Sequence, residues 1–131
     1  MSFDVIGGAV ALPDGTPVPL SKGLRAGDFL FFSGQLAFTD SGALLDGDIT
    51  AQTEQCLENT KALLETAGAS LGDVVKATIW LTNSADFKPF NEVYGRYFAS
   101  TPPTRSCVIS ELVIPGALVE IEVMAYAPVG S

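Results

Sequence analysis

Arg105 is the side chain whose type and position best suit the binding of an anionic ligand. It follows Pro102-Pro103 and begins a segment with strand character. Its guanidinium offers a planar fork of N–H donors that pairs with a carboxylate through two hydrogen bonds. That carboxylate could belong to Glu120 or Glu122 across an antiparallel pair of strands, or to a small-molecule substrate. Local sequence leaves both alternatives open.

Glu120 lies in an alternating segment, residues 118–126, that predicts a strand. A period of two places Glu120, Glu122 and Met124 on one face and aliphatic side chains on the other. One interpretation is a half-buried strand with a polar outer face. The other makes Glu120 a general base, or a carboxylate that positions water, beside the cation of Arg105.

The two cysteines, Cys56 and Cys107, are expected to be structural. No base occurs near Cys107, so packing or pocket lining is its expected role, and Cys56 falls on the apolar stripe of a predicted helix. They show no CxxC spacing, which argues against a disulfide framework or a thiolate metal cage. Histidine is absent, so Ser-His-Asp and Cys-His catalysis are excluded, and we expect no metal site.

Length and composition predict one domain over residues 1–131. Charged residues make up 17% of the chain, below the roughly 25% of typical soluble domains, which weakly indicates self-association. A net charge of −8 disfavours binding to nucleic acid or to anionic membranes. The chain shows no signal-peptide pattern and no apolar run of about 18 residues, so we expect a cytoplasmic location.

Hydrophobic periodicity predicts an α+β fold in which two helices pack on one face of a mixed sheet. The first 28 residues are loop-rich, and Arg25 is expected in a solvated loop. Strands are expected over residues 3–8, 29–32, 74–81, 105–111 and 118–127, with the run at 29–32 buried. One helix is expected over residues 48–67, and a second starts near Asp86 with Arg96 on its polar side.

The helix at residues 48–67 has clear signals at both ends. Asp48 or Thr50 is the expected N-cap, and Gly68 is the expected glycine after its C-terminus. The stripe that contains Cys56 should face the core, and Gln52 is expected on the opposite, polar side.

Four motifs taken together resemble the RidA (YjgF) family. They are Ser33-Gly34-Gln35 after an apolar strand, Asp86-Phe87 with Asn91-Glu92-Val93-Tyr94 on a helix, Pro103-Thr104-Arg105-Ser106-Cys107-Val108, and Val119-Glu120-Ile121-Glu122. Their order and spacing match over nearly the whole chain, from Pro19 to Ala127.

The resemblance implies a chorismate-mutase-like fold that assembles as a homotrimer, with an inner β-barrel, helices outside and sites between subunits. It implies hydrolytic deamination of reactive enamine or imine intermediates, of the 2-iminobutanoate/2-iminopropanoate type, to 2-oxo acids and ammonia. No cofactor or metal is implied. The implied partners are further copies of the chain and small 2-imino or 2-oxo carboxylates, with no nucleic acid and no membrane.

The resemblance also assigns roles to individual positions. Arg105 corresponds to the arginine that grips the substrate carboxylate, and Glu120 to the glutamate that holds or activates the attacking water. The positions implied to line the pocket are Cys107, Ser33, Gly34, Asn91 and Leu20. At Leu20 the chain departs from the best-known deaminases of the family, which have a tyrosine there. The missing hydroxyl affects the expected substrate range and rate and leaves the carboxylate grip in place.

Three functions are therefore weighed. The first is the imine deaminase, or a relative acting on a neighbouring enamine such as aminoacrylate. The second is a non-catalytic trimer that binds small carboxylates as a sensor or partner module, in which Arg105 still binds the acid and Glu120 is dispensable. The third is ribonuclease activity, a label sometimes attached to the family, which the charge of −8 and the lack of histidine make the least favoured.

Overall fold

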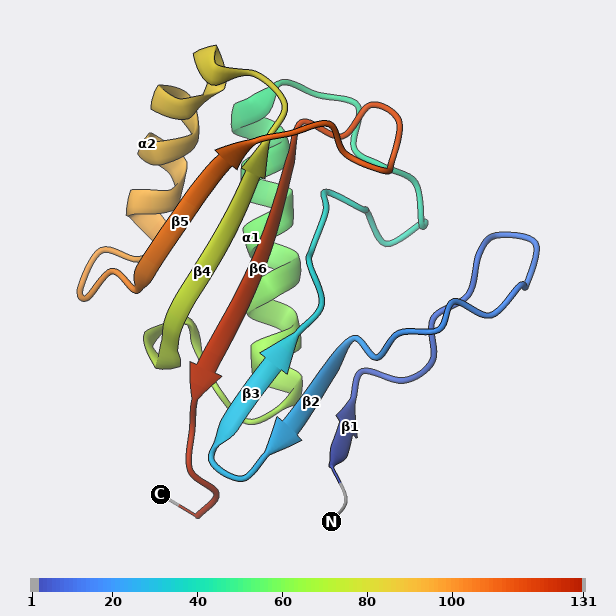
Figure 1. The fold of residues 1–131 in the computed structure, drawn as a ribbon, viewed down its shortest axis with the longest axis vertical. Helices are drawn as coiled ribbons and strands as arrows, with labels where there is room; N and C mark the ends of the chain where they lie inside the picture. The colour runs from blue at the N-terminus through green and yellow to red at the C-terminus, as the bar shows by residue number, and fades with distance from the viewer. Residues whose placement is uncertain (1–2, 131) are drawn as a thin grey trace.

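The computed structural model describes residues 3–130, in which six strands form one sheet and two long helices lie against it (Figure 1). The strands are β1 Asp4–Ile6, β2 Gly23–Ala26, β3 Phe29–Phe32, β4 Val74–Leu81, β5 Thr104–Ile109 and β6 Val119–Tyr126. The helices are α1 Ile49–Thr66 and α2 Phe87–Tyr97, with 3-10 turns η1 Leu71–Asp73 and η2 Ser84–Asp86. The predicted α+β class is confirmed.

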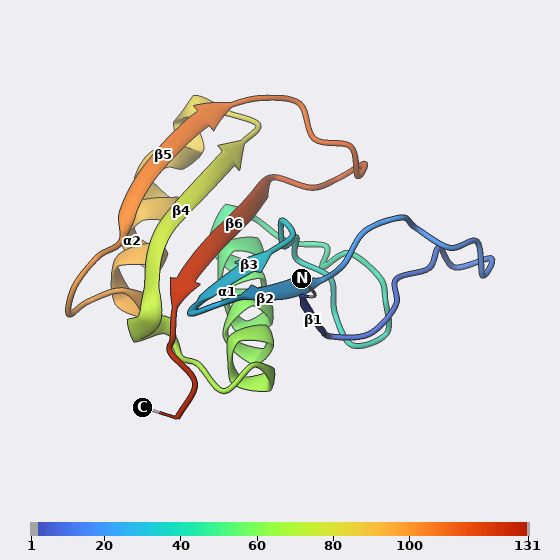
Figure 2. The ribbon, with the colours of Figure 1, turned by 60° about the horizontal axis from the view of Figure 1, so that its bottom comes forward.

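The sheet places β5 at its edge, since the strand order is β1-β2-β3-β6-β4-β5. β4 and β5 run parallel, and every other neighbouring pair is antiparallel. Parallel neighbours need a crossover connection, which α2 supplies. Both helices cover the same face of the sheet and leave the other face open, as predicted (Figure 2).

The two faces of the sheet differ in burial because strand side chains alternate. In β6, Val119, Ile121 and Val123 are buried beneath the helices, whereas Glu120 and Glu122 are directed to the open face. This alternation fixes which chemical groups of the strands meet the helices and which do not.

The strand predicted at residues 29–32 is confirmed as β3, but it is buried on one face only and not throughout. Leu30 and Phe32 are buried, but Phe29 and Phe31 are 39% and 45% exposed. The apolar run indicated burial on both faces, yet among residues 3–130 no layer covers the open face of the sheet.

The ends of α1 match the sequence signals. The Asp48 carboxylate accepts a hydrogen bond from the backbone N–H of Ala51 at 2.9 Å, which caps the first turn. Gly68 follows the helix with a φ of +79°, a left-handed conformation that favours glycine. Cys56 is fully buried, as predicted. No helix in the described part of the chain is long and apolar enough to cross a membrane.

Gln52 was expected on the exposed side of α1, and this expectation is wrong. Its side-chain amide donates to the carbonyls of Leu45 (3.1 Å) and Gly116 (3.0 Å), and its oxygen accepts from the N–H of Leu118 (2.8 Å). The residue is 2% exposed. Two loops cover this turn of the helix, and one amide satisfies backbone groups that would otherwise be buried without partners.

The second helix starts at Phe87 directly after η2, one residue from the expected start at Asp86. Pro89 falls within its first turn, where a proline is tolerated. The observed β5 and β6 are slightly shorter than the predicted segments 105–111 and 118–127. Arg96 is on the exposed side of α2, where it forms an ion pair with Glu54 at 3.3 Å.

The N-terminal region holds a strand that the sequence did not reveal. β2 pairs with both β1 and β3, and it includes Arg25, which was expected in a solvated loop. The Arg25 guanidinium donates to the carbonyl of Ala127 at 2.8 Å and to that of Ala67 at 3.5 Å. It therefore ties β2 to the ends of α1 and β6, contacts that only the folded chain creates.

Candidate functional site

Arg105 lies on the edge strand β5 with its side chain directed toward α2. In the register of the sheet it pairs with Ala77, a buried residue on the helix-covered face. Its Cζ atom lies 4.9 Å from the ring centroid of Tyr94, 5.6 Å from that of Phe87 and 5.8 Å from that of Phe90. These distances are within the range of cation–π contact. The residue nevertheless remains exposed.

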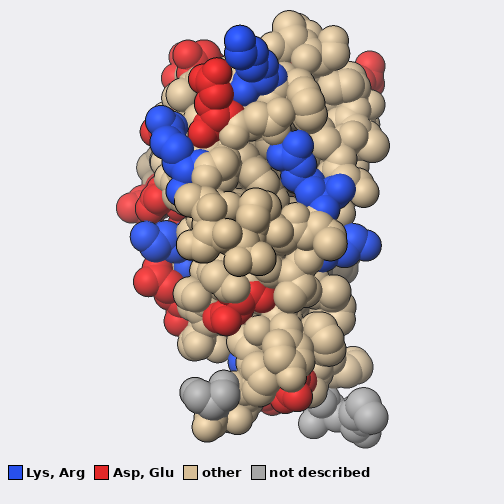
Figure 3. All heavy atoms as spheres, turned by 90° about the vertical axis from the view of Figure 1, so that its left-hand side faces the viewer, with Lys and Arg blue, Asp and Glu red and all other residues tan. Residues whose placement is uncertain are grey.

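The guanidinium of Arg105 has no acidic partner and no hydrogen bond within residues 3–130; the one ion pair there joins Arg96 and Glu54. Its N–H donors are therefore available to a ligand carboxylate. Figure 3 shows the side of the molecule formed by α2 and β5, where basic groups are separated by uncharged and acidic surface. Basic groups that are separated in this way suit a small acid better than an extended polyanion.

Cys107 and Asn91 lie on the same side of the sheet as Arg105. Cys107 pairs with Ile79 and is half-buried; burial raises the pKa of its thiol, and the charge of Arg105 opposes the shift. The thiol therefore stays protonated at neutral pH, as suits a lining residue. On α2, the side-chain oxygen of Asn91 is buried and accepts no hydrogen bond within residues 3–130.

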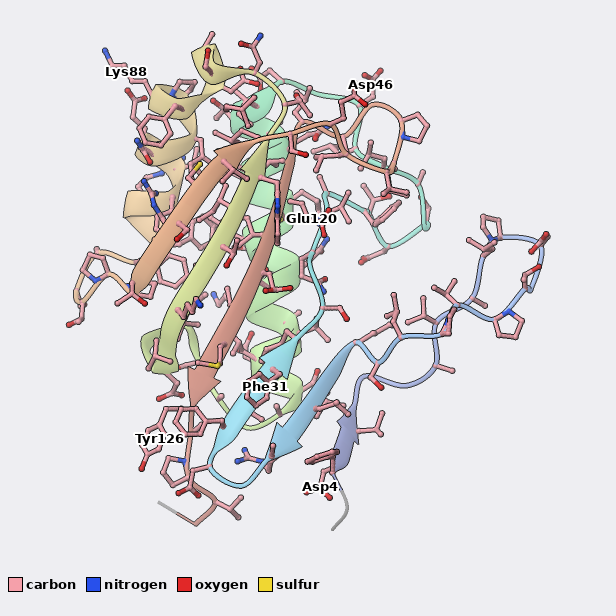
Figure 4. All side chains as sticks on the ribbon, in the orientation of Figure 1. Asp4, Phe31, Asp46, Lys88, Glu120 and Tyr126 are labelled. Carbon is pink, nitrogen blue, oxygen red and sulfur yellow. The ribbon has the colours of Figure 1, made fainter. Side chains whose placement is uncertain are left out.

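Glu120 lies on β6 beyond the end of β3, beside Gly34 (Figure 4). A Cβ atom at Gly34 would collide with the Glu120 carboxylate, so the lack of a side chain at Gly34 makes room for it. Glu120 is half-buried, and its pKa is raised first by that burial and then by the negative charge of Glu122. A carboxylate with a raised pKa is a stronger base toward a bound water molecule.

Ser33 and Leu20 belong to the same region as Glu120. The Ser33 hydroxyl donates to the carbonyl of Ser21 at 2.7 Å, which holds the residue after Leu20 against the end of β3. Leu20 is 45% exposed and ends the long loop between β1 and β2 that extends from the body of the protein (Figure 1). Gln35 pairs with Ile121 through two backbone hydrogen bonds of 2.7 and 3.0 Å and so fixes Gly34 beside β6.

The predicted residues thus form two groups, one around Arg105 and one around Glu120, and these two side chains lie on opposite faces of the sheet. The β5 group is Arg105, Cys107 and Asn91; the β6 group is Leu20, Ser33, Gly34 and Glu120. The assignment to faces follows from the register, since Arg105 shares a row with buried Ala77 and Glu120 pairs with Trp80 in the alternate row.

The expectation that Arg105 pairs with Glu120 or Glu122 across antiparallel strands is therefore wrong. β4 lies between β5 and β6, which separates those two strands by roughly 10 Å. Within one chain Glu120 is also not beside the cation of Arg105, because the sheet itself lies between the two side chains.

The aromatic surroundings of Arg105 are the functional feature that sequence reasoning missed. Phe87, Phe90 and Tyr94 all belong to α2. Their spacing of three and four residues puts them on one helix face, but only the crossover geometry brings that face to Arg105. Within residues 3–130 no cluster of three or more acidic or sulfur side chains is arranged to hold a metal ion.

Comparisons with known proteins agree with the fold. Residues 15–127 match the family model described as Endoribonuclease L-PSP. The RutC family protein PH0854 of Pyrococcus horikoshii is 45% identical over 109 residues, which is 82% of this chain and 86% of that protein.

Solved structures give the same result. RidA from the Antarctic bacterium Psychrobacter sp. PAMC 21119 superposes with a TM-score of 0.83 at 36% identity, over 94% of this chain and 98% of that one. The YjgF protein of E. coli superposes with a TM-score of 0.78 at 33% identity, over 82% and 87% of the two chains. The chain therefore belongs to the endoribonuclease L-PSP family, the group that includes RidA and YjgF.

Proposed function

We propose that the protein hydrolyses reactive 2-imino acids, and the enamines from which they form, to 2-oxo acids and ammonia. The observation that carries the proposal is the guanidinium of Arg105 on the exposed edge strand, which has no acidic partner within residues 3–130. A free cation with a planar donor fork recognises the carboxylate common to all these substrates. The similarity to RidA supports the same assignment.

In the proposed mechanism Arg105 binds the carboxylate and thereby fixes the position of the adjacent imine carbon. Glu120 accepts a hydrogen bond from a water molecule and takes its proton as the water oxygen bonds to that carbon. The nitrogen of the tetrahedral adduct then takes this proton back from Glu120. It leaves as ammonia while the hydroxyl group of the adduct loses its own proton to Glu120 and becomes the carbonyl of the 2-oxo acid. An iminium carbon is already electrophilic, so orientation and one activated water suffice.

We further propose that the site is completed between copies of the chain, in a homotrimer with the open sheet faces inside. Arg105 and Glu120 lie on opposite faces of one sheet, so the β5 group of one subunit would face the β6 group of the next. The open face carries exposed aromatic side chains, among them Phe31 and Tyr126 (Figure 4), and an apolar surface of this kind suits burial against a second copy.

The test is a coupled imine-hydrolysis assay. An amino-acid oxidase generates 2-imino acids from several amino acids, and semicarbazide traps the imine that escapes hydrolysis. We expect the wild-type protein to lower the amount of imine that semicarbazide traps, and Arg105→Ala to leave that amount unchanged. Arg96→Ala is the matched control, because it removes an exposed arginine outside both residue groups. Equal activity of wild type and Arg105→Ala would reject the proposal.

A non-catalytic carboxylate-binding role is the second candidate. It is favoured by the separation of the β5 group from Glu120 and by Leu20, which brings no hydroxyl to the β6 group. In that case the protein binds small 2-oxo acids with no acceleration on any imine, and Glu120→Gln keeps full affinity. Ribonuclease activity is not favoured, because the net charge of −8 opposes the approach of a polyanion.

A further inference from the structure

The guanidinium of Arg105 contacts aromatic rings, whereas many functional arginines are paired with acidic side chains. Three rings of α2 surround its guanidinium at 4.9 to 5.8 Å, and no carboxylate within residues 3–130 pairs with it. An acidic neighbour would orient the side chain but would also occupy its donors and offset its charge. Aromatic rings attract the cation through their electron-rich faces and accept no bidentate hydrogen bond.

We propose that Phe87, Phe90 and Tyr94 form an aromatic cage that orients Arg105 while leaving its charge and its N–H donors free for a ligand carboxylate. This inference rests on the proposed function, which it deepens by naming the positioning residues of the carboxylate site. The site should therefore bind acids tightly only while none of these three side chains carries a negative charge.

Of the three cage residues, only Phe87 can be replaced without disturbing the core, because the other two are buried. Phe90 is fully buried and Tyr94 is 5% exposed, so both also belong to the core. Tyr94 packs on Phe98 at a centroid distance of 4.7 Å, and its replacement would disturb that packing. Phe87, by contrast, is 44% exposed in the first turn of α2. Its ring can be replaced without opening a cavity.

The decisive comparison is Phe87→Glu against Phe87→Gln. The two side chains have the same shape, and either would bring its terminal group close to the place of the Phe87 ring, within reach of Arg105. Glutamine removes the ring alone. Glutamate also supplies an internal carboxylate that competes with the ligand for the same donors.

The experiment measures the affinity of each full-length variant for pyruvate by isothermal titration calorimetry. We expect Phe87→Gln to bind about two- to fivefold more weakly than wild type, the effect of an exposed cation–π contact. Phe87→Glu should bind at least tenfold more weakly than Phe87→Gln, and Phe87→Tyr, which keeps a ring, should bind as wild type does. In the imine assay Phe87→Gln should raise KM and leave kcat nearly unchanged.

Lys88→Glu is the charge control. It adds more negative charge than Phe87→Glu at the adjacent position, but Lys88 points away from the sheet (Figure 4). It should change pyruvate affinity less than twofold. Equal thermal midpoints for Phe87→Gln and Phe87→Glu would exclude a difference in folding.

The outcomes separate the cage from the proposed function. If Arg105→Ala binds pyruvate as wild type does, the proposed function fails. If Arg105→Ala loses binding while Phe87→Glu and Phe87→Gln bind equally well, the cage is rejected and the carboxylate grip stands. A loss in Lys88→Glu as large as in Phe87→Glu would also reject the cage, because it would reflect the charge of the whole helix.

Discussion

Arg105 and Glu120 project from opposite faces of the same sheet, with β4 between their strands. A carboxylate held by Arg105 is therefore screened from the Glu120 of its own chain by the sheet. The proposed hydrolysis needs both groups at one substrate, which only a second copy of the chain can provide.

Subunit complementation tests this arrangement directly. Arg105→Ala and Glu120→Gln should each be inactive, whereas a trimer refolded from equal amounts of both should recover about a quarter of wild-type activity. That fraction follows if every site takes one residue from each of two neighbouring subunits in a closed ring. Imine hydrolysis by the mixture, measured against each variant refolded alone, gives the answer. A mixture as inactive as its parents would place both residues of a site in one chain.

The acidic limb of the pH profile of kcat/KM should reflect the ionisation of Glu120. Its pKa is raised by burial and by Glu122, and the deprotonated form is the base, so kcat/KM should rise with pH through that pKa. Glu122→Gln removes a neighbouring negative charge, which favours ionisation of Glu120 and should move this limb to lower pH. Profiles of wild type and Glu122→Gln between pH 4 and pH 8 test the direction, and a shift to higher pH would contradict it.

Gly34→Ala should impair catalysis while the protein stays folded. The new methyl group would collide with the Glu120 carboxylate and displace it, so we expect kcat to fall tenfold or more. Gly95→Ala is the control, because a Cβ at that position of α2 meets open space and should leave activity unchanged. Both variants should keep wild-type circular dichroism. Full activity of Gly34→Ala would show that the position of Glu120 is unimportant.

Cys107→Ser should be a mild substitution. Burial raises the pKa of the Cys107 thiol, and among the residues that the structure describes no base is hydrogen-bonded to it, so we expect turnover to fall less than about threefold. Alkylation of the wild-type thiol by iodoacetamide should likewise be slow at pH 7. Complete loss of activity in Cys107→Ser would instead indicate a covalent step through sulfur.

Gln52→Ala should destabilise the fold more than an exposed substitution on the same helix. It leaves two carbonyls and one N–H without their partner, and each buried unsatisfied group costs about 1–3 kcal/mol. Urea unfolding should show a loss of at least about 2 kcal/mol, against little change in Glu65→Ala, which lies on the exposed side of α1. Equal urea midpoints for Gln52→Ala and Glu65→Ala would mean that water replaces the hydrogen bonds of the Gln52 amide.

The sequence alone was enough to predict the helix ends and strands that depend on residues close together in the chain. The cap at Asp48, the glycine at Gly68 and the position of Pro89 act within one or two turns, so both ends of α1 and the start of α2 were predictable to within a residue or two. The strand at residues 74–81 was predicted with its observed limits. The residue types of the candidate site were also recognisable, because a guanidinium and a carboxylate keep their chemistry in any fold.

The tertiary structure decided which of these groups meet. The insertion of β6 between β3 and β4 is a long-range pairing that no local pattern encodes, and it put Arg105 and Glu120 on different faces. The crossover through α2 brought Phe87 to Arg105 for the same reason. Loop packing buried Gln52, and strand pairing brought Arg25 within hydrogen-bonding distance of the carbonyl of Ala127. In each case the cause is a contact between segments far apart in the sequence, and periodicity carries no information about such contacts.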